Sequence, residues 1–276
     1  ADAEKYPLRL ADLLVLDLSP DLCPEKIVWA NSVPMRRVPS FGMAGDVIYE
    51  PMWVSERFVP YTQTAMFVDP AGRGTDETAV CVASFANGYV FIHELIGLEG
   101  GYDNAVLLKI AKLAYQYGIN LIRVESNWGD AMFCQLLRPV VAEICGQVAI
   151  EEYRVSGSKE SRMISVLEPI MASHRLCFNT KAIKQEETQK QLTRLHDGRG
   201  SLKHDDRVDV LSAAISYWED NLGVNIDNVI ARNKEQEQID VIRDWMDDGR
   251  RARSLLRGRA SGALKVNDRF NRRFGR

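Results

Sequence analysis

The sequence lacks several features that would assign it to particular classes of protein. It has no apolar run of about 18 residues, so no membrane-spanning helix is expected. The first ten residues carry charges and lack the apolar stretch of a signal peptide. The cysteines form no Cys-x-x-Cys pair, which argues against a zinc site, and we expect reduced, mostly buried residues of a cytosolic protein. They are Cys23, Cys81, Cys134, Cys145 and Cys177.

The composition is that of an ordinary globular protein, but the charge is unevenly distributed. The 276 residues are 46% hydrophobic and 26% charged, and the chain is long enough to bury a sizeable core. Residues 243–276 hold ten Arg and one Lys against four Asp, a net +7, which leaves −10 for the rest of a chain whose total is −3. Such a tail indicates an anionic partner or an acidic protein surface, although a solvated tail with no specific role is equally expected.

The chain divides into three predicted parts. Residues 1–60 contain the apolar run Leu13–Leu18 and prolines at positions 20, 24, 34, 39, 51 and 60. Such frequent prolines argue against long helices, so this part is predicted to be a loop-rich lead-in or linker. Residues 61–222 carry regular secondary-structure patterns and form the predicted core, and residues 223–276 form the basic C-terminal tail.

Alternating strand and helix patterns predict an α/β core. Apolar segments bounded by turn residues indicate strands at 65–68, 79–85, 89–96, 121–124, 149–155 and 175–178, with Asn87-Gly88 as a hairpin turn. Helical periodicity covers residues 102–117, 129–137, 158–172, 181–195 and 205–218. Three antiparallel strands followed by strand–helix–strand units predict a mixed β-sheet flanked by α-helices.

Acidic residues occupy the ends of two predicted strands and the start of one predicted helix. Asp69 ends the first strand, Glu125 ends the fourth, and Asp205, Asp206 and Asp209 open the last helix. Ligands of open α/β sheets bind beyond the carboxyl ends of the strands, so these acids can meet there. At a separation of about 4 Å, two such charges repel by about 4 kcal/mol at an effective dielectric constant near 20. A cluster therefore needs protons, bases or metal ions.

Carboxylate oxygens alone favour hard cations such as Mg²⁺ or Mn²⁺. Two such ions, about 4 Å apart, can activate water and stabilise the leaving oxygen of a phosphodiester. Each acid also has a purely structural interpretation. Asp69 before Pro70 fits a turn residue, Glu125 fits an ordinary charge at a strand end, and Asp205 or Asp206 fits a helix cap. Asp209 differs, because it lies inside an apolar helix and shares a face with Asp206.

Three short motifs resemble those of the nuclease half of large terminase subunits of tailed bacteriophages. Val68-Asp69-Pro70-Ala71-Gly72-Arg73-Gly74-Thr75-Asp76-Glu77-Thr78-Ala79 is similar to the first motif, in which Asp is followed by Gly, Asp and Thr-Ala. Val124-Glu125-Ser126-Asn127 resembles the second, and His204-Asp205-Asp206-Arg207-Val208-Asp209 the third. The similarity extends from about Met66 to Trp218.

This resemblance implies a ribonuclease H-like fold and two Mg²⁺ or Mn²⁺ ions. It implies cleavage of concatemeric double-stranded phage DNA during packaging, in the cytoplasm of the infected host cell. Asp69 and Glu125 carry over as catalytic metal ligands. In the third motif Asp206 and Asp209 are the first choices, and Asp205 is either a ligand or the helix cap.

Large terminases also contain an ATPase with a Gly-Lys-Ser/Thr phosphate loop, and neither tripeptide occurs here. We therefore expect no ATPase activity and interpret residues 1–60 as the link to a missing ATPase half of the same full-length chain. Portal protein and small terminase subunit are the further partners that the resemblance implies. No membrane partner is expected.

Basic residues near the acids are candidate DNA contacts. Lys159 and Arg162 lie in the first turn of a helix, where backbone N–H groups favour anions, although an ordinary capped helix is the simpler alternative. Arg73 lies in a glycine-rich loop, and Lys203 and Arg207 flank the third acidic motif.

Three other functions are compatible with the same residues. One is another ribonuclease H-like nuclease, such as a Holliday-junction resolvase or a transposase core. Another is a sugar kinase or actin-like ATPase, because Asp69-x-x-Gly72-x-Gly74-Thr75 faintly resembles their phosphate loop. The third is a non-catalytic module that binds DNA or portal, whose acids are only structural.

Overall fold

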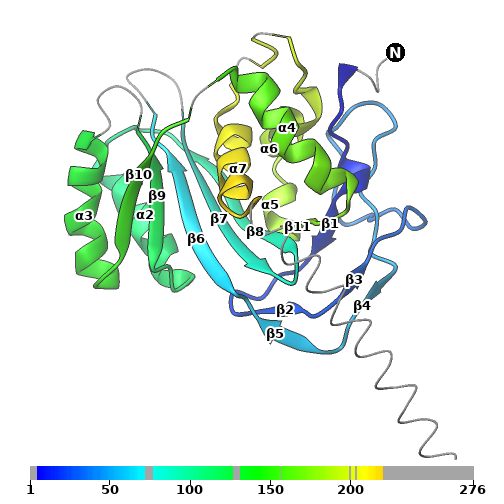
Figure 1. Ribbon diagram of the computed structural model, residues 1–276, viewed down its shortest axis with the longest axis horizontal. Helices are drawn as coiled ribbons and strands as arrows, with labels where there is room; N and C mark the ends of the chain where they lie inside the picture. Colours follow the sequence, from blue (N-terminus) through cyan, green and yellow to red (C-terminus); the bar gives the residue numbers. More distant parts are fainter. Residues whose placement is uncertain are drawn as a thin grey trace, which may run out of the picture. The chain divides into compact units, whose positions relative to one another are not determined.

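The computed structural model describes residues 5–71, 77–126, 131–155, 157–198, 200–202 and 204–219 (Figure 1). Their centre is a seven-stranded mixed sheet in the order β1-β11-β8-β7-β6-β9-β10. The strands are β1 (Leu14–Leu16), β6 (Gln63–Asp69), β7 (Thr78–Ala86), β8 (Tyr89–Leu98), β9 (Leu121–Glu125), β10 (Ala149–Tyr153) and β11 (Leu176–Asn179). The predicted mixed sheet flanked by helices is thus confirmed.

An antiparallel meander of β6, β7 and β8 forms the middle of the sheet. Asn87 and Gly88 connect β7 to β8 with φ values of 52° and 76°, so both residues are in the left-handed region. Tight hairpin turns of this kind match the twist of the flanking strands, and Asn-Gly adopts them readily. The predicted hairpin is confirmed.

Two helices cover one face of the sheet. α2 (Asn104–Gln116) and α3 (Ala131–Cys145) pack on the face that carries Met66, Val80 and Val82, and they connect β8 to β9 and β9 to β10. Strands β6, β9 and β10 are consequently parallel to one another. The predicted end of the second helix at residue 137 is wrong. α3 continues through Pro139, because Leu137 and Val141 are fully buried against this core.

Four helices cover the opposite face: α4 (Lys159–Ala172), α5 (Thr180–Ile183), α6 (Glu186–Arg194) and α7 (Asp206–Tyr217) (Figure 1). α7 lies over β6 and β7, and Trp218 at its end packs against Phe67 and Phe85. The single helix predicted at 181–195 is divided into α5 and α6. Gln189 stabilises this break, because its buried amide donates to the carbonyl oxygens of Ile183 and Pro39 at 2.7 and 2.9 Å.

The predicted lead-in contributes to the core. β1 is the edge strand that pairs in parallel with β11, and Leu10, Leu13 and Val15 are fully buried around it. Asp46 accepts hydrogen bonds from the backbone N–H groups of Leu10 and Ala11 at 2.8 and 3.0 Å, which fixes the short 3₁₀ helix Leu10–Asp12. The predicted boundary at residue 61 therefore cuts through one packing unit. A link from residues 1–60 to an ATPase half stays a prediction.

The remaining strands, which lie between β1 and β6 in the sequence, form two small antiparallel sheets. β2 (Leu22–Pro24) pairs with β5 (Phe58–Pro60), and β3 (Ile27–Val28) pairs with β4 (Trp53–Val54). All five cysteines are free, as predicted, and four of them are buried. Within the described ranges, every helix is too short or too polar to cross a membrane. The basic tail lies outside the described residues.

Candidate metal centre

Two of the predicted acids are neighbours because of strand register. β6 and β9 are parallel, and Val68 is opposite Val124, so Asp69 and Glu125 follow side by side at the carboxyl ends of these strands. Side chains alternate along a strand, which places both carboxylates on the same face of the sheet. Only 8% of Asp69 and 5% of Glu125 is exposed, so solvent screens their charges weakly.

The third acid comes from the helix that covers this face. Asp209 lies in the first turn of α7 and is 3% exposed. Asp69, Glu125 and Asp209 each offer a carboxylate oxygen, and these three oxygens all lie within 4.8 Å of one another. Three buried acids from three separate segments thus converge on one point, which we call the acidic triad.

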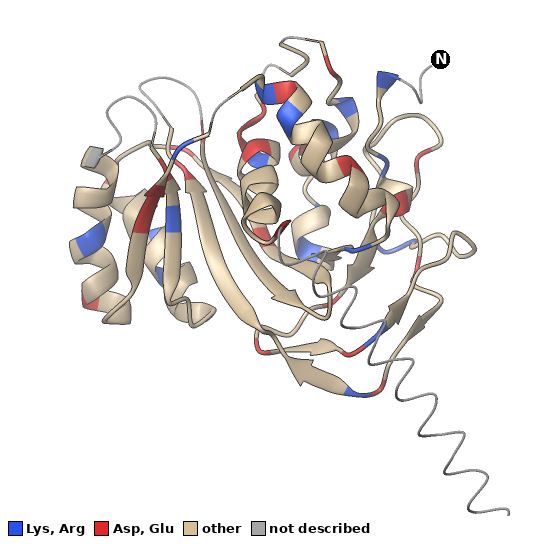
Figure 2. Ribbon diagram, in the orientation of Figure 1, with Lys and Arg blue, Asp and Glu red and all other residues tan. Residues whose placement is uncertain are grey.

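Two basic side chains from α4 contact the triad at Asp209. Lys159 Nζ lies 3.0 Å from one carboxylate oxygen, and Arg162 Nη2 donates to the other at 2.5 Å. Lys159 also donates to Asp205 at 2.8 Å. Acidic and basic residues accordingly alternate at the starts of α4 and α7 (Figure 2). These cations offset part of the negative charge of the triad.

Burial and crowding of charge perturb the pKa of Asp69. Burial raises it most, the charges of Glu125 and Asp209 raise it further, and Lys159 opposes them, so that the pKa reaches about 8. Burial alone would lower the pKa of Lys159, but Asp209 and Asp205 raise it above its ordinary value. The triad therefore holds a proton that a divalent cation would displace at neutral pH.

The other predicted ligands occupy the edge of the triad. Asp205 precedes α7 without capping it through its side chain, and its carboxylate pairs with Lys159. Asp206 is close enough for its charge to raise the pKa of Asp69, although its contribution is smaller than those of burial, Glu125 and Asp209. The structure thus brings Asp69, Glu125 and Asp209 together and sets Asp205 and Asp206 beside them.

Arg207 points to a different partner. Its guanidinium binds Glu77 with two hydrogen bonds of 2.6 and 3.0 Å, and it also donates to Gln185 at 2.7 Å. The side chain is only 11% exposed, so its donors are directed into the protein. Sequence reasoning did not single out Glu77 as this partner, since nothing local indicates a pairing 130 positions apart. Arg73 and Lys203 lie outside the described residues.

Tyr153 is a further neighbour of the triad that sequence reasoning missed. It is the last residue of β10, and it lies opposite Glu125 in the parallel pairing of β10 with β9. The available signal was positional, because the predicted strand 149–155 should end beside the strand that carries Glu125. Tyrosine at a strand end is otherwise unremarkable, so the residue type alone did not mark it.

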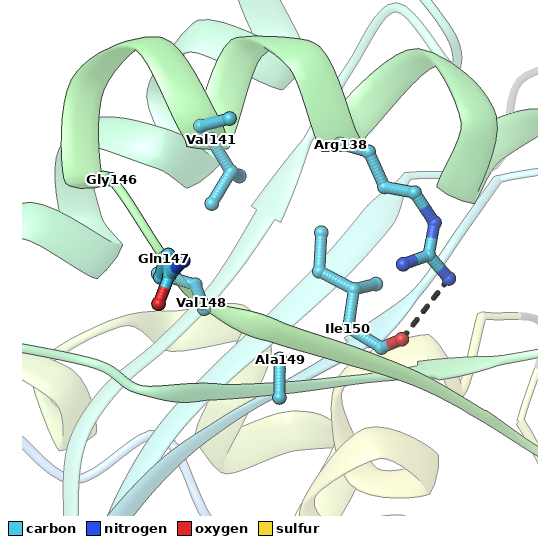
Figure 3. Close-up of a pocket in the computed structure, with 8 residues that line it drawn as sticks. Arg138, Val141, Gly146, Gln147, Val148, Ala149 and Ile150 are labelled. Atoms are coloured by element: carbon cyan, nitrogen blue, oxygen red, sulfur yellow. Dashed lines mark hydrogen bonds between the residues drawn. The ribbon is translucent and has the colours of Figure 1, made fainter.

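A separate pocket of about 420 Å³ lies at the other end of β10 (Figure 3). It is formed between the end of α3 and the start of β10, and Arg138 Nη2 donates to the carbonyl oxygen of Ile150 there at 3.1 Å. Its lining contains no carboxylate. It therefore lacks the ligands of a hard cation, and the acidic triad is the better candidate for a reactive site.

Comparison with known proteins identifies relatives of the chain. The family model of the ribonuclease H-like domain of the bacteriophage T7 terminase matches residues 68–176, which include Asp69 and Glu125. The large terminase subunit of Enterobacteria phage T3 is 33% identical over 234 residues, which cover 79% of this chain and 40% of that protein. The chain thus spans less than half the length of this relative.

Solved structures of terminase nuclease domains are also similar. The human cytomegalovirus domain matches with a TM-score of 0.44 at 15% identity, covering 60% of this chain and 88% of that one. The nuclease of thermophilic phage G20c matches with a TM-score of 0.40 at 18% identity, covering 56% and 81%. Residues 68–176 thus match the ribonuclease H-like domain of the phage T7 terminase, and the chain is similar to part of a phage terminase large subunit.

Proposed function

We propose that this chain is a metal-dependent endonuclease that cleaves double-stranded DNA during genome packaging, by two-metal-ion hydrolysis of phosphodiester bonds. The observation that carries the proposal is the convergence of Asp69, Glu125 and Asp209, all buried, within 4.8 Å. Carboxylates gathered at this spacing repel one another, and a divalent cation between them would relieve that repulsion. Lys159 and Arg162 contact the triad at Asp209.

The residues of the triad fit Mg²⁺ or Mn²⁺. Their donors are carboxylate oxygens only, a set that favours hard divalent cations over zinc or copper. When bound, such ions supply an activated water and stabilise the leaving oxygen. Asp69 and Glu125 at the ends of β6 and β9 and Asp209 on α7 would hold the ions, and Asp205 and Asp206 could supply further oxygens at the edge of the site.

The bases of α4 are the proposed phosphate contacts. Lys159 is bound to Asp209 and Asp205, and Arg162 to Asp209, so both side chains already lie at the triad. Divalent cations would neutralise Asp209 and leave both bases able to bind a DNA phosphate beside the ions. The DNA affinity of a Lys159→Gln, Arg162→Gln double variant, measured with Ca²⁺, should fall less steeply with salt than that of the wild type. An equal dependence of DNA affinity on salt in the variant and the wild type would show that Lys159 and Arg162 do not contact DNA.

Arg73, Lys203 and Arg207 stay proposed DNA contacts. A DNA phosphate would compete with Glu77 and Gln185 for the donors of Arg207. The ATPase domain of the full-length protein, the portal and the small terminase subunit are proposed partners. The proposed place of action is the cytoplasm of the infected host. The phosphate loop of P-loop ATPases is absent from the sequence, so ATP hydrolysis by this chain is not expected.

The test of the proposed function is cleavage of supercoiled plasmid. Nicked and linear products should form with Mg²⁺ or Mn²⁺ and disappear with EDTA. Branched DNA and plain duplex should be cleaved at similar rates, whereas a strong preference for branched substrates would indicate a resolvase. Absence of cleavage with either ion, by protein that is folded and binds DNA, would favour a non-catalytic assembly module.

Metal affinity is expected to rise with pH up to about 8. Asp69 has a pKa of about 8, and its proton must leave before a cation can bind the carboxylate. Affinity for Mn²⁺ should increase by about tenfold per pH unit between pH 6 and 8 and level off above that range. Calorimetry at pH 6.5 in buffers of different ionisation enthalpy should detect the released proton, and a flat profile would contradict the protonated state of Asp69.

A further inference from the structure

Tyr153 completes a row of side chains across three adjacent strands. In the parallel pairing of β6, β9 and β10, Asp69 lies beside Glu125, and Glu125 lies opposite Tyr153. Residues at equivalent positions of adjacent strands project from the same face of a sheet. The tyrosine side chain therefore shares a face with both carboxylates and is next to Glu125.

The hydroxyl group of Tyr153 is buried and lacks a hydrogen-bond partner among the described residues. Burial raises the pKa of this phenol, and the charges of Glu125, Asp69 and Asp209 raise it further, in that order. The hydroxyl is therefore a neutral donor beside the triad. Buried donors are almost always paired in native proteins, and an unpaired one costs about 1–3 kcal/mol.

The aromatic ring of Tyr153 also contacts Arg123. The Arg123 guanidinium lies 5.1 Å from the centre of the Tyr153 ring and 4.9 Å from that of Tyr217. Such stacking limits the rotation of the ring. The position of the hydroxyl is therefore determined by the sheet and by Arg123, independently of the acids.

We infer that Tyr153 is a positioning residue for the metal centre: with a divalent cation bound, its hydroxyl donates to the Glu125 carboxylate and orients that carboxylate toward the ion. The inference rests on the proposed function. Partners that hydrogen-bond a ligating carboxylate orient it, and their loss typically lowers metal affinity by about 10- to 100-fold. Glu125 stands between Asp69 and Tyr153, so the donor approaches it from the side away from the other acids.

The test is Tyr153→Phe, which removes the hydroxyl and keeps the ring that stacks on Arg123. Without DNA, the affinity for Mn²⁺, measured by electron paramagnetic resonance of the free ion, should fall by about tenfold or more. At saturating DNA and limiting Mn²⁺, kcat should fall while KM for DNA is unchanged, and excess Mn²⁺ should restore kcat. Thermal stability in EDTA should not decrease, because the hydroxyl makes no bond there.

Tyr217→Phe is the matched control. Tyr217 is the other tyrosine stacked on Arg123, and its hydroxyl oxygen accepts a hydrogen bond from Gln63 at 3.0 Å. Removing that hydroxyl should leave the affinity for Mn²⁺ unchanged. Wild-type affinity for Mn²⁺ in Tyr153→Phe, or a change confined to KM, would overturn the inference and leave the proposed function intact. Failure of the wild type itself to bind Mn²⁺ or to cleave DNA would instead refute the proposed function.

Discussion

Asp69→Asn is expected to reduce metal-dependent DNA cleavage on the order of a thousandfold. The substitution removes the proposed metal ligand Asp69, which is 8% exposed and has its carboxylate close to those of Glu125 and Asp209. Charge stabilisation by a bound metal ion contributes several kcal/mol to a transition state, and about 4 kcal/mol corresponds to three powers of ten in rate. Initial rates of plasmid nicking at saturating Mn²⁺ measure the effect.

The fold of this variant should persist and even gain stability. Asparagine has the size of aspartate but no charge, so repulsion by Glu125 and Asp209 disappears. The pKa of Asp69 is raised from 3.8 to about 8 in the folded state, so the folded protein holds this proton where the unfolded chain has lost it. Wild-type stability should consequently fall between about pH 4 and pH 8, by the contribution of this group, and remain lower above that range.

Urea unfolding of the wild type and the variant in EDTA, at pH 4, 6 and 8.5, measures both the gain in stability and its dependence on pH. Asp69→Asn should lack this decline, so its advantage over the wild type should grow with pH. The matched control is Asp21→Asn at an exposed aspartate, which should change neither cleavage nor the pH profile. Cleavage by Asp69→Asn at the wild-type rate would show that the triad does not hold the catalytic ions.

The acids were predictable from sequence because each follows a local rule. Asp69 and Glu125 end apolar strands, and register then places such residues side by side. Asp209 was marked by its position between Val208 and Val210, and it is indeed buried. Which acid of the last motif joins the triad depends on the rotation of α7 over the sheet. Local periodicity does not define that rotation to within the few ångströms that separate Asp206 from Asp209.

Features that depend on distant contacts were not predictable. β1 has three residues and owes its place to pairing with β11, more than 150 positions later in the chain. Proline at position 139 signals a helix end locally, but burial of the residues around it overrides this preference. In the same way, Lys159 and Arg162 were predicted as DNA contacts at the start of a helix, and their partner Asp209 became visible only in the packed structure.

The ion pairs of Asp209 predict the second large effect, a loss of stability on substitution, whereas substitution of Asp69 should increase stability. Asp209→Ala should destabilise the metal-free protein by about 3 kcal/mol, since removing one partner of a buried ion pair typically costs about 3–5 kcal/mol. We take the lower value because the Lys159 side chain is 40% exposed and solvent screens its charge. Arg162, at 22% exposure, should account for most of the loss. Urea unfolding at pH 7 in EDTA measures it.

A double-mutant cycle tests whether the loss arises from the unpaired cation. Arg162→Met keeps a long apolar side chain without charge, and in its background Asp209→Ala should cost much less than in the wild type. Lys190→Met is the matched control, because Lys190 pairs with Glu186 of its own helix α6, away from Asp209. An equal cost of Asp209→Ala in all three backgrounds would mean that α4 does not stabilise Asp209. Together with Asp69→Asn, opposite signs within one triad would show that the protein stabilises the charge of Asp209, whereas it holds Asp69 against repulsion in a position that suits a metal ion.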